Sequence, residues 1–558
     1  MPSTSPALDF DYVIVGAGTA GCLLANRLSA DPTCRVLLVE AGGPDNYHWI
    51  HIPVGYLYCI GNPRTDWCYQ TESEAGLGGR SLRYPRGRVL GGCSSINGMI
   101  YMRGQSRDYD GWAAFTGDPR WRWEHCLPRF LRHEDHWAGE DALHAAPGFD
   151  PTGRRAGGEW RVERQRLRWE ILEAFAAAAQ AGGIPATTDF NRGSNEGVGY
   201  FEVNQRAGWR WNAAKAFLHP VRGRANLQVW THAVVERLHF GTDANGSLRC
   251  EGVGLVRQIP GQAREAIGVR AAREVLLCSG AVATPALLER SGVGQGERLS
   301  ALGIDPVLEL PGVGENLQDH LQLRMVYRVS GTSTLNTRAA HWWGKAGIAL
   351  EYLLRRSGPM SMAPSQMGCF TRSSPGLAWP DLEYHVQPLS LEAFGKPLDG
   401  FNAFTASVCH LNPASRGSIH IRSAKADAAP LIQPNYLSTA SDRSVAAQAL
   451  RLTRRIVAQA PLTPFQPEEV RPGPQLQSEQ DLQDAAGRIG TTIFHPVGTT
   501  RMGPAGDPGR VVDSELRVCG IARLRIVDAG VMPTITSGNT NAPVLMIAEH
   551  AAELIRGV

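Results

Sequence analysis

The stretch that decides the fold reads DYVIVGAGTAGCLLANRLS and covers residues 11–29. Its opening, Asp11–Val15, is mostly apolar and β-branched, which is typical of a buried parallel strand. Residues 19–29 carry apolar side chains at helical spacing, and Asp31-Pro32 predicts the end of that helix. A second apolar run, Arg35–Val39, completes a strand–helix–strand unit. We expect its sheet to be parallel and its crossover right-handed.

Three glycines, Gly16, Gly18 and Gly21, lie where this strand meets this helix, and Glu40 ends the second strand. Gly16 permits a tight turn, Gly18 lets the backbone approach a pyrophosphate at the helix N-terminus, and Gly21 lets helix and sheet pack closely. An acid about twenty residues beyond the glycines can accept hydrogen bonds from ribose hydroxyls. The unit therefore predicts a dinucleotide site, and it leaves NAD and FAD both open.

The bulk properties exclude several classes of protein. The chain has 558 residues, 56 Lys+Arg against 53 Asp+Glu and no long run of one charge, so we expect no nucleic-acid partner. Its 11 cysteines lack zinc-site spacing, and we expect mostly buried thiols and no metal. The N-terminus lacks a signal-peptide pattern, and no stretch reaches the roughly 20 apolar residues of a membrane span. We expect a cytoplasmic protein whose membrane contact is at most peripheral, on the inner face.

Further strands and helices extend this α/β pattern. We expect strands at 227–231, 233–240, 252–257, 273–280 and 524–527, and helices at 170–182, 285–291, 445–458 and 542–554. Residues 321–493 mix strands, helices and loops. We therefore expect a cofactor domain over residues 8–320 with irregular insertions, a sheet-based (α+β) substrate domain over 321–494, and a segment 495–558 that completes the cofactor domain and the active site.

Two long motifs carry a family resemblance. Residues 86–98 (RGRVLGGCSSING) and 279–294 (SGAVATPALLERSGVG) resemble the two signatures of the glucose-methanol-choline oxidoreductases, and GVGENLQDH at 312–320 also belongs to that pattern. The resemblance runs from about Asp11 to Arg556. It implies an FAD laid across a Rossmann-like domain, with the flavin facing a second, sheet-based domain that is interleaved with the first along the chain.

The resemblance also implies which residues meet the cofactor. Gly16, Gly18, Gly21, Glu40, Ala41 and Val235 match the ADP-binding positions, and the flavin-side positions are Val89, Gly92, Asn97, Gly98, Met99, Asp528, Ala529 and Asn541. Ser279, Gly280 and Ala542 match further cofactor-binding positions. Cys93 stands where the family usually has a small hydroxyl residue or glycine, a mild departure. Ile96 stands where some members carry a histidine joined to the flavin, so we expect noncovalent FAD.

A catalytic pair follows from HPVGT at 495–499 and SGNTNAP at 537–543. Oxidation of an alcohol needs a base that takes the hydroxyl proton as hydride leaves the carbon, and histidine has a suitable pKa. By resemblance His495 is that base, and Asn539 holds the family's second position, where an amide can donate to the developing alkoxide. We expect His51, His320 and His385 to be structural or to line the pocket.

The substrate is less closely defined. By resemblance the pocket walls come from Trp342-Trp343, Met360–Phe370 and Tyr384–Gln387, and Phe494 either walls the pocket or packs in the core. These side chains are mostly uncharged, which favours a neutral aromatic or aliphatic primary alcohol over choline, whose ammonium needs a carboxylate or an aromatic cage. Glu351 or Glu383 could be that carboxylate, so choline stays open.

Other activities stay open as well. The chain could be a non-redox lyase of the same family or a nonenzymatic FAD module. The electron acceptor could be oxygen or a quinone-like molecule.

Overall fold

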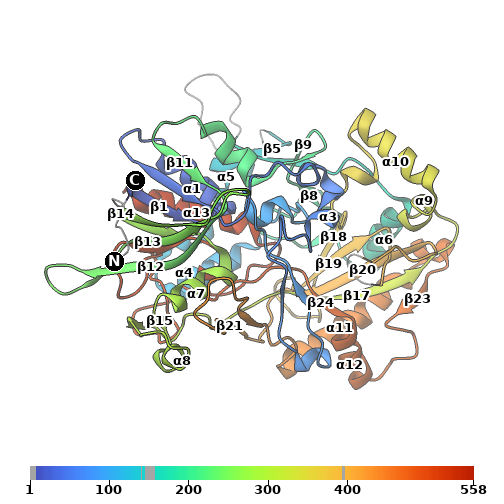
Figure 1. Cartoon of the computed structure of the whole chain (residues 1–558). Coiled ribbons are helices and arrows are strands. Elements are labelled where there is room, and N and C mark those ends of the chain that lie inside the picture. The colour runs from blue at the N-terminus through green and yellow to red at the C-terminus, as the bar shows by residue number, and fades with distance from the viewer. Residues whose placement is uncertain (1–7, 140, 142, 145–157, 393–395, 558) are drawn as a thin grey trace.

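The computed structural model describes residues 8–139, 141, 143–144, 158–392 and 396–557. Two large sheets with their helices lie side by side along the long axis of the molecule (Figure 1). The first sheet contains the strand–helix–strand unit predicted from residues 11–39, and the second contains most of the strands between residues 321 and 492. The expected α/β fold with a Rossmann-like and a sheet-based part is confirmed.

The first sheet has the strand order β11-β2-β1-β14-β13-β12, and β25 pairs with β14. The strands that pair in parallel are β1 (Leu8–Val15), β2 (Val36–Val39), β11 (Leu227–Trp230), β14 (Glu265–Leu277) and β25 (Leu524–Ile526). An antiparallel hairpin, β12 (Ala233–Thr242) and β13 (Leu248–Arg257), extends the sheet from β14. Val13, Ile14, Leu37 and Leu38 are fully buried, which explains why these strands are apolar on both faces.

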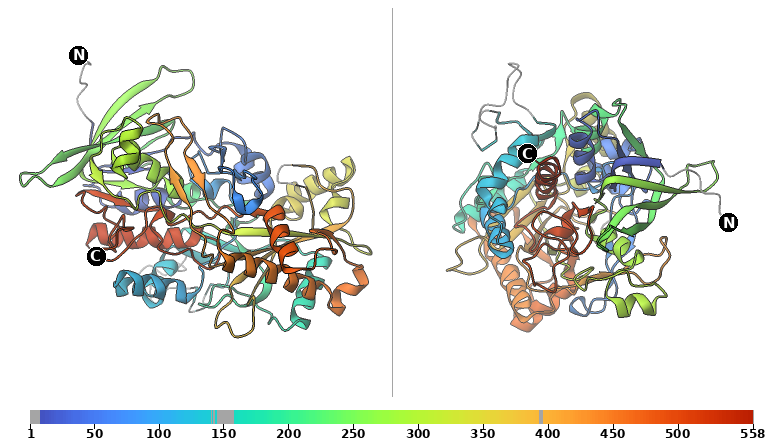
Figure 2. Two further views of the ribbon diagram at one scale, coloured as in Figure 1. Left: turned by 90° about the horizontal axis from the view of Figure 1, so that it is seen from below. Right: turned by 90° about the vertical axis from the view of Figure 1, so that its left-hand side faces the viewer.

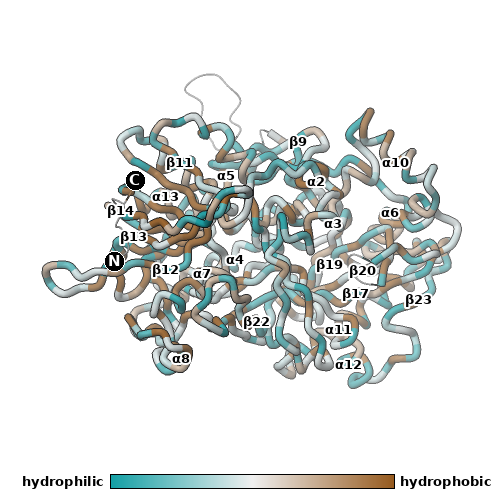
Figure 3. The backbone as a smooth tube through the Cα atoms, in the orientation of Figure 1, coloured by the Kyte–Doolittle hydropathy of each residue, from teal (hydrophilic) through white to brown (hydrophobic). Residues whose placement is uncertain are grey.

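Two helices from opposite ends of the sequence pack together beside this sheet: α1 (Thr19–Leu28) and α13 (Asn541–Arg556). Figure 2 shows α13 in dark red beside the blue and green strands. Figure 3 shows the apolar, brown character of this region. Both helices lie within one residue or two of their expected ends. The C-terminal segment therefore folds onto the N-terminal unit.

Helix α7 begins earlier than the sequence predicted. We expected it over Pro285–Ser291, but it spans Gly280–Arg290. Proline lacks the N–H that would bond the carbonyl four residues earlier, here that of Ala281. The Thr499 hydroxyl donates to that carbonyl at 2.6 Å, so the helix runs through the proline. Similarly α11 begins at Ala440, five residues before the expected start, because Thr439 caps its N-terminus.

The second sheet has the order β23-β17-β20-β19-β18-β7, with β24 beside β17, and all its pairs are antiparallel. Its strands are β23 (Glu468–Arg471), β17 (Leu321–Arg328), β20 (Ala403–His410), β19 (Leu382–Gln387), β18 (Met367–Thr371), β7 (Gly197–Tyr200) and β24 (Gly490–Thr492). The strand β7 comes from the part of the chain that we expected in the cofactor domain. The second sheet is thus built from segments on both sides of residue 321.

The two faces of the second sheet differ in chemistry. Leu323, Met325 and Tyr327 of β17 join a core with α6 (Glu170–Ala181), α11 (Ala440–Val457) and α12 (Glu479–Ile489). Because side chains alternate along a strand, Gln322 and Arg324 point to the opposite face. That face carries polar side chains and looks toward the cavity described below.

Shorter elements cover the two sheets. The helices are α2 (His48–His51), α3 (Tyr56–Cys59), α4 (Ser106–Thr116), α5 (Trp123–His133), α8 (Gly296–Ala301), α9 (Leu335–Arg338) and α10 (Trp342–Arg355). The short strands are β3 (Tyr69–Gln70), β4 (Arg83–Tyr84), β5 (Glu134–His136), β6 (Trp160–Arg164), β8 (Glu202–Val203), β9 (Gln205–Arg206), β10 (Trp209–Arg210), β15 (Val293–Gly294), β16 (Leu308–Glu309), β21 (Ser418–His420) and β22 (Leu431–Gln433). Among the described residues, no helix has the length and apolar character to cross a bilayer.

Candidate active site

A cavity of about 1210 Å³ runs between the two sheets. Ligand cavities for a single small molecule usually measure about 300–1,000 Å³, so this one has room for more. Most residues predicted from the sequence line it: Gly16, Gly18, Glu40, Ala41, Gly92, Asn97, Gly98, Met99, Val235, Ser279, Gly280, His495, Asp528, Ala529, Asn539 and Asn541. The fold therefore brings together residues that are more than 500 positions apart in the sequence.

Three predicted cofactor residues lie behind the cavity wall: Gly21, Val89 and Ala542. A Cβ atom at Gly21 would lie 1.9 Å from the carbonyl oxygen of Gly16, so Gly21 allows α1 to approach the turn. Val89 and Ala542 are buried at 1% and 2% exposure. These three residues shape the site by packing against its lining.

The nucleotide end of the cavity fits a dinucleotide. A Cβ at Gly92 would lie 2.6 Å from the Cα of Gly18, which keeps two glycine loops in close contact. Helix α1 starts there without a side-chain cap, so its first N–H groups face the cavity and can bind phosphate. The buried Nδ2 of Asn541, at the start of α13, has no protein partner and can donate to a bound group.

Two carboxylates hold these loops in place. Glu40 accepts hydrogen bonds from the backbone N–H of Ala17 at 3.0 Å and of Gly42 at 2.8 Å. Burial raises the pKa of Glu40 to about 7, although those two donors oppose the shift. Asp528 accepts from the backbone of Gly280 at 2.9 Å and from Thr284 Oγ1 at 2.6 Å. Both acids fix the backbone around the cavity, and Glu40 keeps lone pairs for a ribose.

The other end of the cavity is built around His495, which is only 7% exposed. Its Nδ1 lies 3.1 Å from Nδ1 of His320, and Nε2 of His320 lies 2.9 Å from the carbonyl oxygen of Leu411. A carbonyl only accepts, so His320 donates from Nε2 and accepts at Nδ1. His495 then donates from Nδ1, and its Nε2 keeps a lone pair.

That lone pair faces Asn539, whose Nδ2 lies 3.1 Å from Nε2 of His495. Because Nε2 accepts, the amide nitrogen of Asn539 is the donor in this contact. Oδ1 of Asn539 is buried without a protein partner. The pair thus offers a proton acceptor and a hydrogen-bond donor at one point of the cavity wall.

Burial lowers the pKa of His495 well below its usual 6.5, and the positive charges that His320, His385 and Arg86 can carry lower it further. Burial also lowers the pKa of His320. Both rings are therefore neutral near pH 7. A neutral imidazole that carries a lone pair on Nε2 can take a proton from a bound hydroxyl group that replaces the amide of Asn539 in this contact.

Asp319 positions this pair and was not among the predicted site residues. Its Oδ1 accepts from the backbone N–H of His495 at 2.8 Å, and its Oδ2 accepts from the hydroxyls of Tyr84 at 3.0 Å and Thr492 at 2.6 Å. Asp319 and His320 end the GVGENLQDH motif. That motif was the sequence signal for both residues.

Comparison with known proteins identifies the family of the chain. A family model described as GMC oxidoreductase matches residues 10–322, and its C-terminal counterpart matches residues 413–548. The chain belongs to the GMC oxidoreductase family. It is an FAD-dependent oxidoreductase, and the predicted cofactor is confirmed.

Relatives of this GMC oxidoreductase have named activities. It is 40% identical over 557 residues to choline dehydrogenase, mitochondrial, from Homo sapiens, covering 98% of this chain and 90% of the relative. It is 38% identical over 557 residues to oxygen-dependent choline dehydrogenase from Staphylococcus aureus, covering 98% and 93%. The crystal structure of pyridoxine 4-oxidase from Mesorbium loti matches at a TM-score of 0.85 with 32% identity, covering 98% and 99%.

At the substrate end of the cavity, the lining differs in part from the pocket walls expected from the sequence. Trp342 and Trp343 do not line it and are 75% and 59% exposed, because the cavity meets α10 only farther along, at Lys345, Ile348 and Ala349. The expected 360–370 and 384–387 segments contribute Met360, Met362, Pro364, Ser365, His385 and Gln387. Phe494 lines the cavity as well.

The two acids considered for a choline ammonium do not line the cavity. Glu351 pairs with Arg338 at 3.6 Å, and Glu383 is buried 2.9 Å from His385. The lining instead includes Gln322 and Arg324 of β17, which the sequence reasoning missed. Their signal was the alternation in LQLRMVYR, residues 321–328, which places 322 and 324 on one face.

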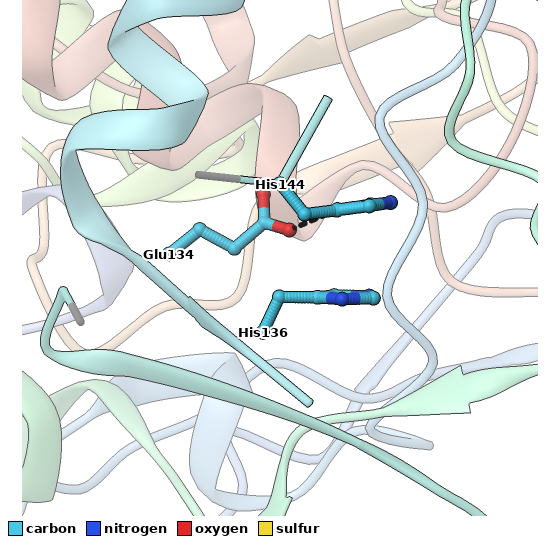
Figure 4. A group of neighbouring side chains, drawn as sticks. All are labelled: Glu134, His136 and His144. Carbon is cyan, nitrogen blue, oxygen red and sulfur yellow. Dashed lines mark hydrogen bonds and ion pairs between the residues drawn. The ribbon is translucent and has the colours of Figure 1, made fainter. Parts of the chain in front are cut away.

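Glu134, His136 and His144 form a buried cluster whose ligand atoms lie within 4.8 Å of one another (Figure 4). The two nitrogens of His144 already contact Glu134 at 2.7 Å and Asp189 at 2.9 Å. These carboxylates raise the pKa of His144 to about 9 despite its burial, so both nitrogens carry protons. Arg103 also pairs with Glu134. We therefore assign no metal to this cluster, and the expectation of a protein without a metal stays a prediction.

Proposed function

We propose that this oxidoreductase converts a primary alcohol to an aldehyde, with Nε2 of His495 as the base. The observation that carries the proposal is the hydrogen-bond chain from the Leu411 carbonyl through His320 to His495. It fixes the protons of both rings so that Nε2 of His495, beside Asn539 in the cavity wall, carries a lone pair.

The chain's own residues have two roles in this reaction. Nε2 of His495 accepts the hydroxyl proton, and Nδ2 of Asn539 donates a hydrogen bond to the same oxygen as negative charge develops there. When bound, FAD supplies the acceptor for the hydride that leaves the alcohol carbon. We propose noncovalent binding, which Ile96 in the cavity lining supports because its side chain cannot form a bond to the flavin.

We propose further that the substrate carries no positive charge. Near Met99, Met362 and Pro364 the wall is apolar, and the charged residue on the β17 part of the wall is cationic Arg324. An ammonium group would be repelled there. Choline remains a second candidate because the relatives with named activities include choline dehydrogenases at 38–40% identity.

An anaerobic panel tests the proposal. The flavoprotein is mixed with primary aliphatic and aromatic alcohols, choline and a cyanohydrin, and the oxidised flavin band near 450 nm is followed. We expect alcohols without positive charge to bleach the band faster than choline. Cyanohydrin cleavage without bleaching by any alcohol would replace the proposal with a lyase activity. Flavin that no alcohol reduces would point to a nonenzymatic FAD module.

The electron acceptor is tested on the same preparation. Reduced flavin is mixed with oxygenated buffer and, separately, with a quinone under argon. Reoxidation by the quinone alone would show a dehydrogenase. Reoxidation by oxygen alone would show an oxidase.

A further inference from the structure

Arg324 is a cation of the cavity wall, and two of its guanidinium nitrogens lack partners. It lies on β17, four residues after His320, and its side chain lines the cavity. Nε and Nη2 are buried and have no hydrogen-bond partner, and within the described ranges no carboxylate lies close enough to form an ion pair with this guanidinium. A buried guanidinium with unused N–H groups is costly unless an anion joins it.

The charges around Arg324 do not supply that anion. Burial lowers its pKa to about 10, the positive charge of Arg471 contributes, and Tyr56 and Asp399 oppose the shift. At neutral pH the guanidinium is still protonated. Asp399 also lines the cavity and is half-buried, and its Oδ2 accepts from Ser390 Oγ at 2.7 Å. Arg324 therefore faces the cavity with a positive charge that no ion pair within the described ranges neutralises.

A second unused donor lies beside it on the sheet. Ser407 of β20 is the direct register partner of Arg324, and its Oγ is buried without a partner. Residues opposite each other on neighbouring strands have Cβ atoms about 5 Å apart, so Ser407 lies next to Arg324 on the same face of the sheet, although Ser407 itself does not line the cavity. A planar guanidinium with two unused donors matches the oxygen atoms of a carboxylate.

The placement relative to His495 sets the length of the ligand. His320 contacts His495, and Arg324 follows His320 by four residues in an extended segment of the chain. At about 3.4 Å per residue, such a step spans on the order of 13 Å between Cα atoms, and the long arginine side chain can shorten the distance. His495 and Arg324 both line this one cavity.

We propose that Arg324 binds the carboxylate of a hydroxy acid whose primary alcohol lies at His495. The two functional groups are separated by a spacer on the order of 10 Å. This inference rests on the proposed function, because it places the reacting hydroxyl beside His495. It narrows the substrate class from alcohols without a positive charge to alcohols with a distal carboxylate.

The test compares ω-hydroxycarboxylates of increasing chain length with diols of the same length. Wild-type holoenzyme is expected to show a kcat/KM for the best acid at least tenfold above that for its diol. Arg324→Gln should lower kcat/KM for the acid on the order of a hundredfold, which is the scale of a lost hydrogen bond to a charged group. The same variant should change kcat/KM for the diol less than threefold. The kcat/KM of Arg324→Lys for the acid should lie between those of wild type and Arg324→Gln, since lysine keeps the positive charge but lacks the planar guanidinium that can donate two parallel hydrogen bonds.

Arg328→Gln is the matched control, because Arg328 lies on the same strand but is exposed and pairs with Glu468. Its kcat/KM values for acid and diol should match those of wild type.

A second readout needs no turnover. A monocarboxylate of the best length, without the hydroxyl, should perturb the flavin spectrum of wild type and bind at least tenfold more weakly to Arg324→Lys. Equal losses for acid and diol, or unchanged carboxylate binding, would overturn the inference. If wild type still oxidises the diol, the proposed alcohol oxidation holds even when the carboxylate inference fails. If neither substrate reduces the flavin, the proposed alcohol oxidation is itself refuted.

Discussion

At the scale of single residues, the state of one nitrogen atom determines what the site can do. Nε2 of His495 carries a lone pair because His320 and the Leu411 carbonyl fix the ring proton on Nδ1. We predict that His495→Ala retains FAD but slows flavin reduction by an alcohol on the order of a hundredfold or more, the usual contribution of a positioned base. Stopped-flow absorbance measures the rate, and the flavin-to-protein absorbance ratio checks cofactor content. An unchanged reduction rate would remove His495 from the mechanism.

The pH profile should report the burial of the same residue. Burial lowers the pKa of His495 well below 6.5, so the neutral ring, which is the active form, persists as pH falls through 6.5. An ordinary histidine would be half protonated there. We predict that the limiting rate of flavin reduction stays constant from pH 8 to about 6.5 and declines only at lower pH. A midpoint at or above 6.5 would contradict a desolvated base.

These residues differ in how far sequence could identify them. His495 and Asn539 lie in short motifs whose chemistry is legible, and both line the cavity as expected. The roles of Asp319 and His320 depend on partners such as Thr492 and Leu411, which are distant in sequence. Arg324 looks like a surface charge until the faces of β17 are known. Sequence therefore identifies reactive groups better than the groups that position them.

At the scale of elements, the strand–helix–strand unit was predicted to within three residues because its pattern is local. The start of α7 was wrong because its reason is not local: Thr499 replaces the hydrogen-bond donor that Pro285 lacks. Trp342 and Trp343 were wrong as pocket walls because a resemblance fixes the position of a helix in sequence but not which of its turns meets the cavity.

The glycine turn before α1 gives a prediction at this scale. Gly21→Ala places a Cβ 1.9 Å from the Gly16 carbonyl, so α1 must move away from the turn that meets the phosphates. We predict loss of most bound FAD and a lower Tm, measured by flavin absorbance and calorimetry. Gly111→Ala is the control: Gly111 also lies in a helix, α4, with no atom within 4 Å of its Cβ position. It should keep full FAD and gain up to about 1 kcal/mol. Equal FAD content in the two variants would refute the packing argument.

At the scale of the whole molecule, the cavity exists because two sheets with different chemistry face each other. The first presents glycine loops and helix N-termini, which suit phosphates, and the second presents the polar side chains of β17 and β19. Neither part encloses a substrate alone. The interleaved chain, with β7 in the second sheet and β25 in the first, joins the two parts by several crossings.

Helix α10, at the edge of the molecule in Figure 1, combines this cavity with an unusual surface. Its Lys345, Ile348 and Ala349 line the cavity, whereas Trp342, Trp343, Leu353 and Leu354 are 59–75% exposed. Glu351 is the one acid of the helix, against Lys345 and Arg355. Exposed tryptophan and leucine with flanking cations suit a bilayer surface that contains anionic lipid.

We therefore predict that the holoenzyme cosediments with vesicles containing anionic lipid, and less with neutral vesicles or at high salt. The double variant Leu353→Glu, Leu354→Glu should bind at least tenfold more weakly while alcohol still reduces its flavin at the wild-type rate, because neither leucine lines the cavity. Leu377→Glu changes another leucine, 40% exposed and outside α10, and should bind as wild type does. Equal vesicle binding by all three proteins would exclude α10 as the contact. Loss of self-association in the double variant, without vesicle binding by wild type, would instead identify a second copy of the chain as the partner of this helix.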